Sequence, residues 1–201
     1  RSRTYVKKIL EKISGEVFKN YRVNKISRSN DNVRISIGSE FMDYDQVVLA
    51  SHADQSLNML DEATKEEKEI LGKFSYVFNS AFLHTDENLM PLRKNAWSSW
   101  NSITKSNKNC VTYWLNKLQN LKTNKNYFLT LNPVEIIDKN KIIKKVNFTH
   151  PYFNSENVKL QEKLHLLQGK KRTWFCGSYF GYGFHEDGLK SSIELIKKFN
   201  S

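Results

Sequence analysis

Residues 172–189 read RTWFCGSYFGYGFHEDGL, and this stretch decides the fold that we predict. The apolar run from Trp174 to Cys176 indicates a short strand, and glycines 177, 181 and 183 indicate a tight turn. A helix is expected to begin near Glu186-Asp187-Gly188, with Asp187 as its cap. Glycines let a backbone approach a ligand closely, and a helix N-terminus presents free N–H groups to an anion. The local pattern alone fits a ligand-binding turn and a purely structural strand–turn–helix about equally.

The first fifty residues predict a helix, a strand, a hairpin and a further strand. Apolar residues recur at helical spacing over 5–13, and residues 21–26 look extended. Residues 33–37 alternate like a half-buried strand after the turn at Asn30-Asp31-Asn32, and residues 45–50 read as a buried strand.

The middle of the chain mixes helical and extended patterns. Thr64 and Glu67 have the spacing of a capping box that opens a helix toward Leu71. The other predicted elements are helical segments at 52–60 and 158–167, strands at 74–84, 97–103, 111–118 and 127–131, and a connecting stretch up to His150-Pro151.

Composition narrows the function classes. The chain has 201 residues, 39% of them hydrophobic, and a formal net charge of +11 from scattered rather than clustered lysines. We therefore expect no nucleic-acid binding. Cys110 and Cys176 form no ligand spacing with histidine, so no metal site is expected, and sparse cysteine favours a cytoplasmic location. No apolar run approaches the ~20 residues of a membrane helix.

The tail resembles the closing FAD motif of the flavin-containing amine oxidases and their phytoene-desaturase and protoporphyrinogen-oxidase relatives. Residues 175–178 match the turn after the strand, and residues 186–192 match the start of the helix. Ser178 departs from the pattern, because these enzymes usually carry an acidic residue there for the ribityl chain.

Over most of its length the chain is similar to a bacterial group of predicted NAD/FAD-binding, amine-oxidase-like proteins. The matching stretches occur in order along the chain and are residues 47–55, 83–86 with 89–91, 96–101, 111–119, 131–133 and 172–189. The resemblance implies an α/β, two-domain flavoprotein fold, present in part, with a mixed sheet and flanking helices. Residues 1–52 and 168–201 would belong to the FAD domain, and residues 53–167 would form the substrate domain.

The same resemblance implies a partner segment and a cofactor site. Such proteins begin with a strand, a Gly-x-Gly-x-x-Gly turn and a helix for the pyrophosphate, and no such turn occurs here. The chain is thus expected to be a C-terminal fragment whose partner is the missing N-terminal segment of the same protein. The resemblance assigns FAD binding to Val23, Gly177, Ser178, Gly183, His185, Glu186, Asp187, Gly188 and Leu189.

Other chemistry-bearing residues stay open to more than one interpretation. His185 is expected beside the flavin, with a loop histidine bonded to backbone as the alternative. His52 fits a ligand-facing position or a helix cap equally well, and Asp54 and Asp86 fit a general base less well than a cap. His84, His150 and His165 are expected to be structural, and about half of Trp97, Trp100, Tyr113 and Trp114 should face a core. No catalytic base is assigned.

The function expected of the intact protein is the oxidation or desaturation of a small organic molecule by FAD. The aromatic middle region and the basic charge favour a hydrophobic or lipid-linked substrate, and the charge also allows peripheral membrane contact. One alternative is a non-catalytic basic module that binds anionic lipid or nucleic acid with steep salt dependence. Another is a decayed or split gene product without activity of its own.

Overall fold

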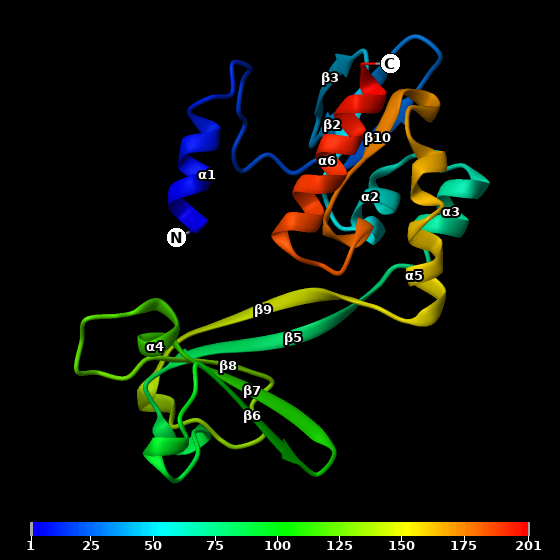
Figure 1. Ribbon diagram of the computed structural model, residues 1–201. Coiled ribbons are helices and arrows are strands. Elements are labelled where there is room, and N and C mark those ends of the chain that lie inside the picture. Colours follow the sequence, from blue (N-terminus) through cyan, green and yellow to red (C-terminus); the bar gives the residue numbers. More distant parts are fainter. Residues whose placement is uncertain (1, 201) are drawn as a thin grey trace. The chain divides into compact units, whose positions relative to one another are not determined.

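The computed structural model describes residues 2–200, which divide into two compact units (Figure 1). Unit 1 is formed by the chain up to Phe74 and again from Asn154 onward, and unit 2 is Ser75–Phe153. The α/β fold class is confirmed, with parallel and antiparallel strands distributed among three sheets.

The boundaries between the units differ from the predicted boundaries at 52/53 and 167/168. Residues 53–74 stay in unit 1 because Glu67 pairs with Arg28 of the first strand. Residues 154–167 do so because Gln161 donates hydrogen bonds to the carbonyl oxygens of Tyr179 and Gly181. The assignment of the units to FAD and substrate domains stays a prediction.

Unit 1 contains a three-stranded antiparallel sheet, a two-stranded parallel sheet and several helices. The antiparallel sheet has the order β1-β2-β3, and the parallel sheet joins β10 to β4. The capping box predicted at Thr64 and Glu67 is confirmed, whereas β3 was not predicted. The elements are α1 (Ser2–Leu10), β1 (Lys25–Arg28), β2 (Val33–Ile37), β3 (Glu40–Tyr44), β4 (Val47–Leu49), α2 (Ala53–Met59), α3 (Lys65–Leu71), α5 (Ser155–Gln161), η4 (Leu164–Leu167), η5 (Lys170–Arg172), β10 (Thr173–Phe175), η6 (Ser178–Phe180) and α6 (His185–Phe199).

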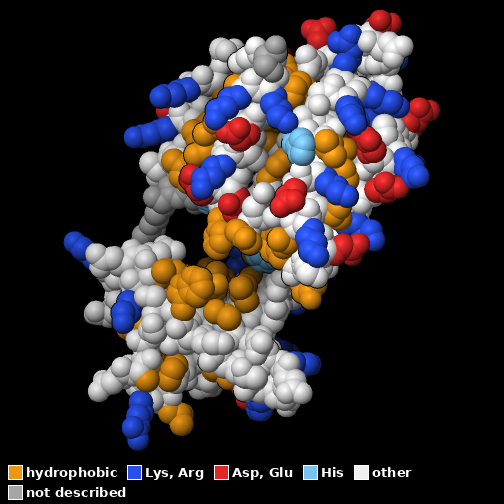
Figure 2. Space-filling view, turned by 45° about the vertical axis from the view of Figure 1, so that its right-hand side comes forward, with side chains coloured by type: hydrophobic (Ala, Val, Ile, Leu, Met, Phe, Trp, Pro, Cys, Tyr) orange, Lys and Arg blue, Asp and Glu red, His pale blue; other side chains and the backbone are white. Residues whose placement is uncertain are grey.

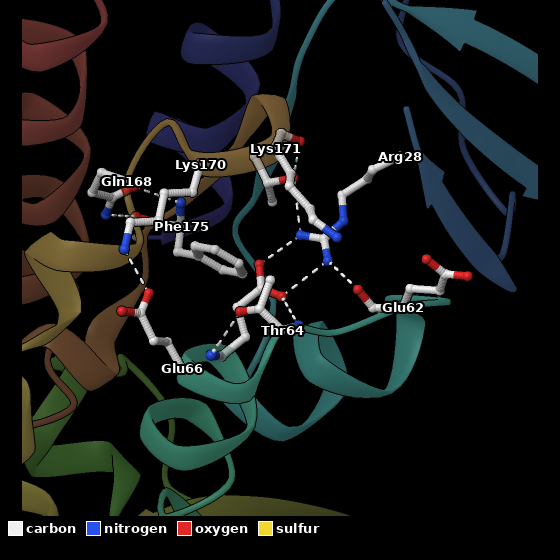
Figure 3. A network of polar contacts seen from close by, with 10 residues as sticks. Arg28, Glu62, Thr64, Glu66, Gln168, Lys170, Lys171 and Phe175 are labelled. Carbon is white, nitrogen blue, oxygen red and sulfur yellow. Dashed lines mark hydrogen bonds and ion pairs between the residues drawn. The ribbon is translucent and has the colours of Figure 1, made fainter. Parts of the chain in front are cut away.

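The parallel sheet has one covered edge and one open edge. Trp174 of β10 lies opposite Val48 of β4. The other edge of β10 is covered by the Gln168 side chain, which accepts the Phe175 N–H at 2.9 Å and donates to the Phe175 carbonyl at 2.7 Å (Figure 3). Among residues 2–200 no strand pairs with the far edge of β4, where Val48 is 46% exposed. Parallel sheets are normally larger and buried, so this edge is a natural place for a further strand.

Unit 2 is a five-stranded antiparallel sheet in the order β6-β7-β8-β5-β9. Its elements are β5 (Ser75–His84), η1 (Glu87–Leu89), η2 (Lys94–Ala96), β6 (Trp100–Lys105), β7 (Lys108–Trp114), α4 (Leu115–Gln119), β8 (Phe128–Leu131), η3 (Lys139–Lys141) and β9 (Ile142–Tyr152). The strand β9 replaces the connecting stretch predicted before His150-Pro151. It is an edge strand, so it tolerates Pro151 and the exposed lysines that hide its pattern in the sequence.

The two faces of this sheet differ in burial. One face carries Phe128, which packs with Met90 and Trp97 in a buried cluster that Trp114 adjoins. Trp100 lies with Tyr113 on the opposite face, where their ring centroids are 5.0 Å apart and Trp100 is 64% exposed. The predicted division of the aromatic residues between core and surface is confirmed.

Candidate functional site

The carboxyl ends of β4 and β10 lie at the same edge of the parallel sheet. The chain leaves β4 through Ser51 into α2, and it leaves β10 through Gly177 toward α6. Ligands of open α/β sheets bind at this kind of edge, where loops follow the strand ends. The predicted cofactor residues of the tail lie in the second of these connections and in the first five residues of α6.

Gly177 occupies a backbone conformation that other residues rarely adopt. Its φ is 150°, and a Cβ atom at this position would lie 2.9 Å from the Tyr179 ring. The Gly177 N–H donates to Ser191 Oγ at 3.0 Å, which ties the turn to α6. The same Cβ would lie 3.6 Å from the carbonyl oxygen of Ser51, so the two strand ends meet at Gly177.

Asp187 organises the start of α6. Its Oδ2 accepts the backbone N–H groups of Tyr182 at 3.0 Å and Phe184 at 2.9 Å. The helix begins at His185, so Asp187 is its third residue and the prediction of Asp187 as the N-cap is wrong. The reason is that the carboxylate bonds backward to the residue before the helix, as the acidic residue of a capping box does. Gly181 makes room for it, since a Cβ there would lie 2.4 Å from Asp187 Oδ1.

The remaining tail residues surround this turn. Gly183 has a φ of 91° and donates its N–H to the Ser178 carbonyl at 3.1 Å. A Cβ at Gly188 would lie 3.7 Å from the Ser178 nitrogen, so this half-buried part of α6 lies close to the turn. Glu186 and Leu189 are exposed.

His185 is the first residue of α6 and is exposed. Its Nδ1 lies 3.0 Å from Tyr5 Oη, so the imidazole bonds to a side chain of α1 rather than to backbone. The position of His185 beside a flavin stays a prediction.

A groove of about 570 Å³ lies beside the end of β4. Val23 is the predicted cofactor residue that lines it. The other lining residues are mainly polar and were not predicted as site residues: Arg22, Asn24, Ser51, Gln55, Asn58 and Met59. Their position after a buried strand was the sequence signal that could have found Ser51 and Gln55.

Ser51 connects the groove to the turn. It lines the groove with Val23, and its carbonyl oxygen faces Gly177. The structure thus brings the groove and the tail together at one sheet edge, and Ser51 is the residue at their junction. A polar groove next to a glycine turn and a helix N-terminus can hold an extended, anionic ligand.

Most of the other histidines and acids bond to neighbouring groups of the protein, whereas the role of His52 stays open. His52 is the N-cap residue of α2, where its side chain makes no capping bond, and Asp54 Oδ1 accepts the Gln55 N–H at 2.8 Å. His165 bonds the Glu162 carbonyl, and His150 Nδ1 lies 3.0 Å from Asn79 Nδ2.

His84 and Asp86 form a buried polar cluster in unit 2. His84 Nδ1 accepts the Asp86 N–H at 3.1 Å, and its Nε2 lies 2.7 Å from Thr130 Oγ1. Burial lowers the pKa of His84, and nearby Asp86 opposes that shift only in part. Burial would raise the pKa of Asp86, but the N–H groups of Asp138 and Asn88, with Lys141, hold it below its usual value. Asp86 is thus an acceptor and a cap rather than a base.

Across residues 2–200 no group of three or more metal-ligating side chains occurs, and Cys110 and Cys176 are free and buried. In the same part of the chain no helix has the length and apolar character needed to span a bilayer.

Comparison with solved structures identifies the fold. A fatty acid isomerase from P. acnes that produces CLA superposes with a TM-score of 0.70 and 15% identity, over 98% of this chain and 52% of that one. A putative protoporphyrinogen oxidase from Exiguobacterium sp. 255-15 gives 0.67 and 10%, over 98% and 50%. A putrescine oxidase variant with redesigned cofactor binding gives 0.67 and 8%, over 98% and 52%.

Comparison of the sequence alone gives no match. No protein-family model and no curated protein matches it. The chain spans about half the length of the structures that it matches. The chain therefore has an α/β fold that corresponds to about half of an amine-oxidase-like fold.

Proposed function

We propose that the chain is part of an FAD-dependent oxidoreductase of the amine-oxidase type that oxidises or desaturates a small organic molecule. One observation carries the proposal: 98% of the chain superposes on about half of an isomerase and of two oxidases, although the identities are only 8–15%. A shared fold at such low identity supports a class of protein and leaves the substrate to be argued from the chain itself.

The residues at the sheet edge fit the proposed cofactor. FAD, when bound, supplies the acceptor for the electrons of the substrate. The first N–H groups of α6, those of His185 and Glu186, have no acceptor within the helix and favour negative charge. The groove that Val23 and Ser51 line offers space for an extended part of the cofactor. Ser178 supplies a hydroxyl where the resemblance leads us to expect a carboxylate, so its contact with the ribityl chain would be weaker.

The open edge of β4 supports the proposed partner segment. A strand that paired with Val48 would extend the two-stranded parallel sheet and bring its own carboxyl end to the groove. A glycine-rich turn after that strand would place a helix N-terminus where a pyrophosphate binds. The proposal assigns this strand and turn to an N-terminal segment of the same protein.

Flavin content tests the proposal directly. The 201-residue chain purified alone should be colourless, because the segment that binds the pyrophosphate is missing. Co-expression with the N-terminal segment should give a yellow protein with about one flavin per complex, measured by visible absorbance and by release of flavin on denaturation. Stoichiometric flavin in the chain alone would refute the division of the site, and a colourless complex would refute the cofactor.

A further inference from the structure

The open face of the unit 2 sheet carries two continuous cross-strand rows. Residues directly opposite one another in paired strands point to the same face of a sheet. The first row crosses all five strands and consists of Lys144, Leu83, Leu129, Tyr113 and Trp100. The second row runs beside it and consists of Val146, Ala81, Leu131, Val111 and Ser102.

These rows form an apolar strip with one cation at its end. Trp100 is 64% exposed, and the other side chains of the first row are partly or fully exposed. Figure 2 shows hydrophobic side chains gathered on the surface of this unit. Five strands about 4.8 Å apart make each row about 19 Å long. The strip thus has the length of an extended alkyl chain rather than of a small polar molecule.

Lys144 places a positive charge at one end of the strip. It is exposed, lies opposite Leu83, and forms no ion pair with any described residue. None of the five strands contains an aspartate or glutamate. Unit 2 carries eleven Lys and Arg against four Asp and Glu, a net charge of +7 over residues 75–153. A ligand with a negative head group is therefore favoured, and a cationic amine is disfavoured at this end.

The next residue in the chain is a natural control. Lys145 lies opposite Phe82 on the other face, with its Nζ 5.2 Å from the centroid of that ring. The two lysines have the same charge and lie in the same strand, β9, but only Lys144 lies at the end of the apolar strip. A general electrostatic attraction would involve both, whereas binding on the strip would involve Lys144 alone.

We infer that this strip binds the alkyl chain of an aliphatic carboxylate, with Lys144 Nζ pairing with the carboxylate. The inference rests on the proposed function, since it names a substrate class for that enzyme. Binding on the strip needs no flavin, so it is measured on the 201-residue chain as it stands. A failure here therefore leaves the flavin test untouched, and a failure of the flavin test leaves this binding to be judged separately.

Calorimetric titration of the chain with decanoate, 1-decanol and decyltrimethylammonium, each below its micelle concentration, tests the inference. Decanoate should bind most tightly. Lys144→Ala should weaken decanoate binding about fivefold, to the level of decanol, as expected for one partly exposed ion pair. Lys145→Ala should leave it unchanged. Lys144→Glu should reverse the preference in favour of decyltrimethylammonium, which shows that the variant is still folded and able to bind.

Three results would overturn the inference. The first is equal affinity of wild type for decanoate and decanol, or no binding of decanoate. The second is equal weakening by Lys144→Ala and Lys145→Ala. The third is sedimentation of the chain with phosphatidylglycerol vesicles that depends equally on both lysines, because the surface would then recognise an anionic bilayer rather than a single carboxylate.

Discussion

The guanidinium of Arg28 meets the carboxylate of Glu67 inside unit 1, with Nη1 2.5 Å from Oε1 and Nη2 2.9 Å from Oε2. Their side chains are only 2% and 3% exposed. Arg28 also donates to Thr173 Oγ1 and the Glu62 carbonyl, and Glu67 accepts the Thr64 N–H. One ion pair and the hydrogen bond to Thr173 thereby join three segments that are far apart in the sequence.

Loss of the Glu67 carboxylate should strongly destabilise unit 1. Glu67→Ala leaves a buried, unpaired guanidinium, which costs about 3–5 kcal/mol in the free energy of unfolding. Urea unfolding followed by circular dichroism measures this difference. The matched control is Glu69→Ala, which breaks the exposed pair of Lys65 and Glu69 on the same helix and should have no measurable effect. Equal effects of the two substitutions would contradict the structural role of the buried pair.

Stability should also depend on pH through His84. Burial lowers its pKa in the folded protein, so between the folded value and the unfolded value the folded state binds fewer protons than the unfolded state. Unfolding is therefore favoured as the pH falls below about 6.5, by at most about 1.4 kcal/mol for each pH unit. Above that pH, His84 is neutral in both the folded and the unfolded state and no longer lowers the free energy of unfolding.

Urea unfolding at a series of pH values from 8 to 5 measures the effect of His84, and NMR titration of its imidazole measures its pKa. In the His84→Gln variant, the free energy of unfolding should depend less on pH in this range. Protonation of Glu67 reduces the stability only at a lower pH. Burial would raise the pKa of that carboxyl, but Arg28 and the Thr64 N–H together hold it below its ordinary value. A His84 titration at the ordinary midpoint would exclude the buried, neutral state.

Much of the fold was predictable because local signals and tertiary packing agree. The capping box at Thr64 and Glu67 and the strand at 33–37 formed where the pattern placed them. The strand β9 was missed because it lies at a sheet edge, where Lys144 and Pro151 are tolerated and the alternation of polar and apolar residues is lost. Edge strands are defined by their neighbours, which a single sequence does not display.

The candidate site was predictable only in its sequential part. The turn and helix of residues 177–189 lie together because they are adjacent in the chain. Helix α6 nevertheless starts before Asp187, since the carboxylate bonds to the N–H of Phe184, and an acidic residue near a helix start does not reveal which position it takes. The groove lining at Arg22 and Asn58 depends on how a loop meets α2, which no local pattern encodes.

Gly181 should be sensitive to the smallest substitution. A Cβ there would lie 2.4 Å from Asp187 Oδ1, so Gly181→Ala displaces the carboxylate that caps α6. The loss of such a cap costs about 0.5–2 kcal/mol. The control is Gly15→Ala, where a Cβ would have no neighbour within 4 Å and stability should be unchanged or slightly raised. Denaturant unfolding of both variants measures the difference, and equal stability would show that Asp187 does not hold the turn.

The N-terminus of α6 should influence a flavin bound at the sheet edge. His185 is the first helical residue, and Phe184 before it is extended, with φ −88° and ψ 160°, so a proline fits at 185 and removes one free N–H group. His185→Ala is the matched control, since it removes the same imidazole and its contact with Tyr5 but keeps the N–H. In the flavin-loaded complex, His185→Pro should reduce at a more negative potential than His185→Ala. The loss of a donor worth about 1–3 kcal/mol corresponds to on the order of 20–60 mV for two electrons.

Potentiometry of the bound flavin decides this last prediction, with flavin content measured on the same samples. Both variants should retain flavin, because neither changes Gly177 or the groove beside β4. A shift common to both variants would assign the effect to the imidazole and its bond to Tyr5. Identical potentials in wild type and both variants would place the start of α6 away from the part of the flavin that becomes negative. The reason is that removal of a preorganised N–H group near that charge has to change the energy of the reduced flavin. The tail would then be a strand, a turn and a helix held together by Asp187 and Ser191 for structural reasons alone.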